Sequence, residues 1–163
     1  MASKRFTNLE EDFYPDETKA GEPTQYLPNI LVDADVLVAI AKKDDSNHTK
    51  ALAISKDLQE KGAQWYVSPF TVAETVTVLS YKVSQREAKA ALKEIRKLDN
   101  FLPLSLKENE INIADKWFLK QEKKGTSYFD CYNMALLEKH NKFLSGIFSF
   151  DSVYARNGFN VVK

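Results

Sequence analysis

The chain has 163 residues, of which 44% are hydrophobic and 28% are charged, as expected for a globular protein with one core. Basic and acidic residues both number 23, so the net charge is zero, which excludes a protein that coats nucleic acid by bulk charge. The single Cys131 excludes an internal disulfide, and we expect a cytoplasmic protein. No apolar run approaches the ~18 residues of a membrane span, and the N-terminus lacks the apolar segment of a signal peptide.

Residues 1–28 differ from the rest of the chain. They show no hydrophobic periodicity, and the stretch PDETKAGEP is typical of a loop or a disordered arm. Through Glu22 this arm holds three basic and six acidic residues, a net charge of −3, so the remainder must carry +3. We expect an acidic N-terminal arm, partly disordered or docked, followed by one domain over residues 29–163.

The first half of this domain begins with an apolar run, ILVDADVLV. The elements expected first are a buried strand at 30–38, a helix at 46–62 capped by Ser46 or Asn47, and a short strand at 63–68. Ser68 and Pro69 then open a buried helix that continues to about Val83, because Ser is a favoured N-cap and Pro a favoured first helical residue.

The second half continues the alternation of helices and strands. We expect, in order, a helix at 84–98, a strand at 101–105, a helix at 107–125, a helix at 128–141 capped by Ser127, a strand at 145–150, a short helix from 152 to near Gly158 capped by Asp151, and a strand at 159–163. Strands separated by helices pair in parallel. The predicted fold class is therefore α/β, a parallel sheet flanked by helices in three layers, with its ligand site at the carboxyl ends of the strands.

Two acids interrupt the first apolar run. Asp33 and Asp35 are two residues apart, so on a strand both would point to one face, which is poor for packing and good for binding a cation. The alternative is that Asp33 ends the strand and caps the next turn. For Asp35 the alternatives are an additional cation ligand or a supporting residue turned toward the following helix.

Glu74 is the only charged residue between Ser68 and Lys82. It forms a capping box with Thr71 in one interpretation and lies in a functional site in the other. Because Ser68 already makes a better helix start, we favour the functional interpretation.

Two further acids have the same two interpretations. Asp130 lies three residues after Ser127 and either pairs with it as a cap or turns inward from the first helical turn. Asp151 follows the apolar strand GIFSF, where capping the next helix is compatible with lying beside Asp33.

Together, the acids indicate a cation site. Two lie at strand ends and two in early helical turns, positions that converge on one edge of a parallel sheet. Carboxylates so close together cannot all ionise unless cations neutralise them, and hard oxygen ligands select Mg²⁺ or Mn²⁺. The sequence contains no zinc spacing, no GxxxxGK[ST] and no GxGxxG, and His48 and His140 are expected in solvent.

These segments, in this order, resemble the PIN-domain ribonucleases, and most closely the VapC-like toxins of toxin–antitoxin pairs. The resemblance covers roughly residues 29–163 and rests on the segments ILVDADVLVAI, SNHTKALAI, VSPFTVAETVTVL, SYFDCYNMALLEKH and IFSFDSVYARNGFNVV. The sequence departs from the family at Asp35, where Asn is usual, and in its N-terminal arm.

The resemblance implies a metal-dependent endoribonuclease. Asp33, Glu74, Asp130 and Asp151 would bind Mg²⁺ or Mn²⁺, with Asp35 as an additional candidate, and Ser149 would position a water or a carboxylate. Candidate contacts to the RNA backbone are Lys42, Lys43, Lys82, Arg86, Lys123, Lys124 and Arg156. Tyr128 and Tyr154 are candidates for stacking a base.

The resemblance also implies partners: an RNA substrate, an antitoxin protein and, by analogy, a second copy in a homodimer. The acidic arm is a candidate to imitate the antitoxin tail in cis. Two other functions stay open. One is a haloacid-dehalogenase-like phosphatase, because DADVL carries an Asp-x-Asp start, and the other is a PIN-like module that binds RNA or protein without catalysis.

Overall fold

The computed structural model describes residues 28–163, so the expected arm lies outside the described residues except for Pro28. One five-stranded sheet has the order β3-β2-β1-β4-β5, and every neighbouring pair is parallel. The strands are β1 (Asn29–Val32), β2 (Gln64–Val67), β3 (Phe101–Pro103), β4 (Gly146–Phe148) and β5 (Val161–Val162). The predicted parallel α/β fold is therefore confirmed.

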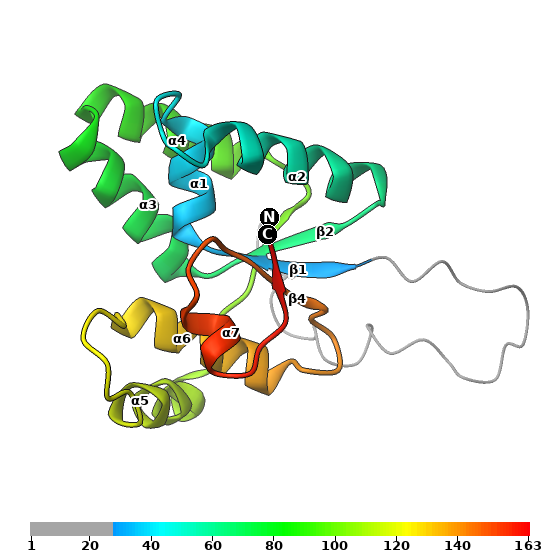
Figure 1. Ribbon diagram of the computed structural model, residues 1–163, viewed down its shortest axis with the longest axis vertical. Helices are drawn as coiled ribbons and strands as arrows, with labels where there is room; N and C mark the ends of the chain where they lie inside the picture. The colour runs from blue at the N-terminus through cyan, green and yellow to red at the C-terminus, as the bar shows by residue number, and fades with distance from the viewer. Residues whose placement is uncertain (1–27) are drawn as a thin grey trace, which may run out of the picture.

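Helices cover both faces of the sheet (Figure 1). One layer holds α1 (Ala34–Ala41), α2 (His48–Glu60), α3 (Pro69–Lys82) and α4 (Gln85–Lys97). The other holds η1 (Glu108–Glu110), α5 (Ile111–Leu119), α6 (Tyr128–Lys139) and α7 (Val153–Arg156). Strand β1 supplies both cores, because its side chains alternate: Ile30 and Val32 pack with the first layer and Leu31 with the second.

The first strand is shorter than predicted. It ends at Val32, and α1 begins at Ala34 with Asp33 as its N-cap, whose side chain accepts a hydrogen bond from Ala34 N. The expected strand over 30–38 was wrong because a continuous apolar run does not distinguish a buried strand from a buried helix. Asp35 therefore lies in the first turn of a helix.

Two helices also differ from expectation. α3 is buried along one face only, at Thr71, Val72, Thr75 and Leu79, whereas Tyr81 is 87% exposed. The helix expected over 107–125 begins as a 3₁₀ turn and ends at Leu119, because the polar residues that follow supply no apolar side chain to continue its buried face. Among the described residues, no helix is long and apolar enough to cross a membrane.

Candidate metal and nuclease site

The central strands β1 and β4 end side by side, and their carboxyl ends define the site. Asp33 follows β1 directly, and its backbone N–H donates to the carbonyl of Phe148, the last residue of β4. Ser149 and Asp151 follow β4. Because β1 continues to β2 on one side and pairs with β4 on the other, this is the switch point at which open parallel sheets bind ligands.

Asp33 is the most enclosed acid of the site, with 4% of its surface exposed. Its Oδ1 accepts from Ala34 N at 2.9 Å and from Asn133 Nδ2 at 3.2 Å, and its Oδ2 accepts from Ser149 Oγ at 2.9 Å. Burial, and then the charge of Asp35, raise the pKa of Asp33 well above its usual range.

Asp35 faces the loop that follows β4. Its Oδ2 accepts from the backbone N–H groups of Phe150 at 2.8 Å and Asp151 at 3.1 Å, and Ser149 Oγ lies 3.3 Å away. Its Oδ1 is buried without a hydrogen-bond partner. Burial raises the pKa of Asp35 to about 6. Asp35 thus fixes the β4–α7 loop with Oδ2, and its Oδ1 remains available to bind a ligand.

Glu74 approaches the same acids from the second turn of α3. Burial, followed by the charges of Asp130 and Asp35, raises the pKa of Glu74 to about 7. The helix is capped by Ser68, whose Oγ accepts from Thr71 N at 2.9 Å. The alternative in which Glu74 forms a capping box with Thr71 was therefore wrong.

Asp130 combines both predicted interpretations. Its Oδ2 accepts from Ser127 N at 2.7 Å, completing the capping box of α6, while its Oδ1 lies 3.4 Å from the Tyr154 hydroxyl, which donates to it. Burial raises the pKa of Asp130, and the charge of Asp151 adds to the rise. Asp151 is exposed, and its Oδ1 accepts from Val153 N at 2.7 Å at the start of α7.

The two roles of Asp130 separate in a pair of variants. Asp130→Asn keeps an acceptor for Ser127 N and removes the charge, so we expect thermal stability without metal to be equal or higher. Asp130→Ala also loses the hydrogen bond that Asp130 accepts from Ser127 N, which costs about 1 kcal/mol. Thermal unfolding in chelator measures the difference. Equal stability of the two variants would show that the capping box contributes nothing.

Sequence reasoning missed Asn133 and misjudged Tyr154. Asn133, one turn after Asp130, is the only amide in the buried run Cys131–Leu137, and that isolated polar residue was the available signal. Tyr154, a candidate for stacking a base, has no exposed surface and packs in the core instead. The Tyr128 hydroxyl donates a hydrogen bond to Asp115 Oδ1.

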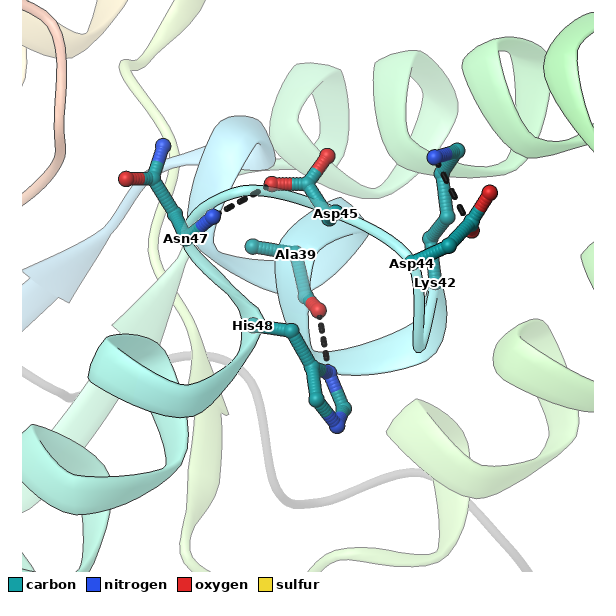
Figure 2. Close-up of polar contacts among 6 residues, drawn as sticks. All are labelled: Ala39, Lys42, Asp44, Asp45, Asn47 and His48. Atoms are coloured by element: carbon teal, nitrogen blue, oxygen red, sulfur yellow. Dashed lines mark hydrogen bonds and ion pairs between the residues drawn. The ribbon is translucent and has the colours of Figure 1, made fainter.

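Figure 2 shows Lys42, a candidate contact to RNA, and His48, which both follow the end of α1. Lys42 forms an ion pair with Asp44 at 2.9 Å. Lys42 lies nine residues after Asp33, about 13 Å along the helix. His48 is half-buried, and its Nδ1 donates to the carbonyl of Ala39 at 2.8 Å. The expectation that both histidines are simply solvated was wrong, since His140 also makes an edge contact with Phe143.

The donor set fits a hard divalent cation. Within residues 28–163, no three Asp, Glu, His or Cys side chains form a preassembled metal cluster. Even so, the charges of Asp35 and Asp130 both raise the pKa values of Asp33 and of Glu74. The buried, unpaired Asp35 Oδ1 supplies the oxygen that such an ion requires. A bound cation would offset the repulsion between the carboxylates and would give Asp35 Oδ1 the partner that it lacks.

Comparison with protein families matches residues 30–160 to the PIN domain. Among solved structures, the chain is similar to the Mycobacterium tuberculosis protein VapC20, described as a sarcin-ricin loop cleaving toxin, with a TM-score of 0.68 and 23% sequence identity. The alignment covers 80% of this chain and 96% of VapC20. A search of curated proteins found no match. Since the family match spans most of the chain, the protein belongs to the PIN-domain family.

Proposed function

We propose that this protein is a metal-dependent endoribonuclease that hydrolyses RNA phosphodiester bonds. The observation that carries the proposal is the convergence of Asp33, Asp35, Glu74 and Asp130 at the switch point of the sheet, with raised pKa values and one orphaned carboxylate oxygen. A fold alone does not keep several carboxylates facing one another, because their repulsion destabilises it.

Each side chain has a role in this proposal. Asp33, Glu74 and Asp130 hold Mg²⁺ or Mn²⁺, with Asp151 at the exposed rim and Asp35 as a further ligand through Oδ1. A bound ion of this kind lowers the pKa of a water molecule and offsets phosphate charge. Ser149 positions carboxylates: its Oγ lies between Asp33 Oδ2 and Asp35 Oδ2 and accepts from Asp151 N at 3.0 Å.

The RNA backbone requires cations near these acids. Lys123 and Lys124 are exposed on the loop before α6, four and three residues before Ser127, whose cap with Asp130 is half-buried. Arg156 lies on α7. We place the first phosphate contacts there. Lys42 and Lys43 follow the far end of α1, Lys82 is the last residue of α3 and Arg86 lies in the first turn of α4. These four serve only a longer RNA.

We expect Lys123→Gln/Lys124→Gln to raise KM for RNA several-fold with little change in kcat. The slope of log affinity against log salt should fall by about 1.4, since each neutralised contact to a single strand contributes about 0.7. Lys56→Gln/Lys61→Gln, which removes two exposed lysines from the α2 region, is the matched control. An equal effect in the control would assign the change to net charge.

We further propose that the chain is the toxin of a toxin–antitoxin pair, supported by its likeness to the toxin VapC20. Induced expression without a partner protein should then arrest bacterial growth, and Asp33→Asn should not. Growth arrest by both proteins would exclude RNA cleavage as its cause. Membership of the PIN family leaves the phosphatase alternative without support.

The proposal is tested by incubating the purified protein with RNA of mixed sequence, DNA and a phosphomonoester in Mg²⁺, Mn²⁺ or chelator. We expect internal cleavage of RNA that requires the metal, and no phosphate release from the monoester. Metal-dependent binding of RNA without cleavage would favour the non-catalytic module.

A further inference from the structure

A chain of hydrogen bonds inside the protein joins two of the site's acids. Asn133 Nδ2 lies 3.2 Å from Asp33 Oδ1 and 3.2 Å from the Tyr154 hydroxyl, which lies 3.4 Å from Asp130 Oδ1. Asn133 is 2% exposed and Tyr154 has no exposed surface. The buried side chains of Asn133, on α6, and Tyr154, on α7, therefore connect the carboxylates of two acids. These acids are Asp33, directly after β1, and Asp130, in the first turn of α6.

The direction of each hydrogen bond follows from the available protons. The amide of Asn133 has two N–H groups, one for Asp33 and one for the Tyr154 oxygen, which leaves the single Tyr154 proton for a carboxylate. Asp130 Oδ1 lies 3.4 Å from this hydroxyl, and Asp33 also interacts with it. With the amide reversed, its oxygen would face the Asp33 carboxylate oxygen, and two acceptors would repel. In the observed orientation Asn133 Oδ1 is buried without a hydrogen-bond partner. The hydrogen bonds that Nδ2 donates are therefore kept although they leave the amide oxygen unsatisfied, which costs free energy.

We infer that Asn133 and Tyr154 are positioning residues that hold the carboxylates of Asp33 and Asp130 in the orientations in which they would bind a divalent cation. This inference rests on the proposed function. Neither residue touches the ion or the RNA. Each donates to a ligand oxygen and so restrains the rotation of that carboxylate, as the partners of metal-binding carboxylates do in general.

The helix α6 offers a matched control for a lost hydroxyl. Tyr132 is 3% exposed, and its hydroxyl accepts a hydrogen bond from Leu106 N at 2.8 Å, outside the acid network. Tyr132→Phe and Tyr154→Phe each remove one buried hydroxyl and keep the ring. A purely structural role for Tyr154 would make the two variants behave alike.

The experiment measures Mn²⁺ binding by titration calorimetry, together with thermal unfolding in chelator, for the wild type, Tyr154→Phe and Tyr132→Phe. We expect Tyr154→Phe to raise the Mn²⁺ Kd roughly 10-fold. Tyr132→Phe should lower the melting temperature and leave the Kd within two-fold. A Kd unchanged in Tyr154→Phe, or raised equally in Tyr132→Phe, would overturn the inference.

A second variant keeps the test decisive if Tyr154→Phe does not fold. Asn133→Leu has a similar volume and removes both donated bonds, so its Kd should rise at least as much, roughly 10- to 100-fold. The double variant should bind more weakly than Asn133→Leu alone, because Tyr154 still donates to Asp130 when Asn133 is replaced. A wild type that binds no Mn²⁺ would instead refute the metal dependence of the proposed function.

Discussion

Asp33→Asn should abolish RNA cleavage while leaving the fold intact. Removing one charged metal ligand withdraws several kcal/mol of transition-state stabilisation, so we expect the rate to fall by about 10³-fold or more. The asparagine oxygen can still accept from Ala34 N and Asn133 Nδ2, and its amide can donate to Ser149 Oγ, whose proton then turns to Asp35 Oδ2. Every hydrogen bond around the position thus has a replacement.

The measurement compares initial cleavage rates in Mn²⁺ and melting temperatures in chelator. Asp44→Asn, which removes an exposed acid paired with Lys42, is the control and should cleave as the wild type does. A melting temperature in chelator that drops by many degrees would mean that Asp33 acts mainly as a helix cap. Retained cleavage in a folded Asp33→Asn would exclude Asp33 from the reaction.

Without metal, the protein should become less stable as pH rises from about 4 to about 7. The folded-state pKa values of Asp33, Asp35, Glu74 and Asp130 are raised, so the folded state binds more protons than the unfolded state across this window. The free energy of unfolding then falls with pH until these groups have ionised. For Asp35 alone, a pKa raised from 3.8 to about 6 corresponds to about 3 kcal/mol.

Urea unfolding at several pH values measures this effect, with Asp35→Asn as the comparison. In Asp35→Asn, the asparagine oxygen can still accept from Phe150 N and Asp151 N, and the side chain no longer ionises. The variant should therefore gain stability relative to the wild type as pH rises. Saturating Mn²⁺ should flatten the wild-type profile, because ligand binding to the folded state offsets the repulsion. A wild-type profile in chelator that is flat, or that rises over this range, would contradict the mutual repulsion of these acids.

The sheet and most helix starts were predictable because local chemistry fixes them. Ser68, Ser84 and Ser127 each accept a hydrogen bond from a backbone N–H three residues on, as N-caps do. The convergence of Asp33 with Asp130 was expected because Asp33 ends a strand and Asp130 lies in the first turn of a helix that leads back into the sheet, and both positions fall on the same edge of a parallel sheet.

Other features depend on contacts that no local pattern reveals. Ala34–Ala41 is apolar enough for a strand or a helix, and the helix forms with Asp33 as its cap beside the end of β4. The Asn133–Tyr154 pair joins residues 21 positions apart, so neither residue's role was visible alone. The helix predicted to end at Gly125 stops at Leu119, because the polar residues that follow offer no apolar side chain to pack against α6.

The most direct test of metal-dependent RNA hydrolysis at this site uses one cleaved RNA and a copy with a 2′-deoxy sugar at the cleavage position. With Mn²⁺ we predict cleavage of both, because water and not the ribose 2′-hydroxyl is the nucleophile. We also predict loss of cleavage in chelator and recovery on adding Mn²⁺ back. Cleavage that persists in chelator, or that requires the 2′-hydroxyl and leaves a 2′,3′-cyclic phosphate, would contradict the account.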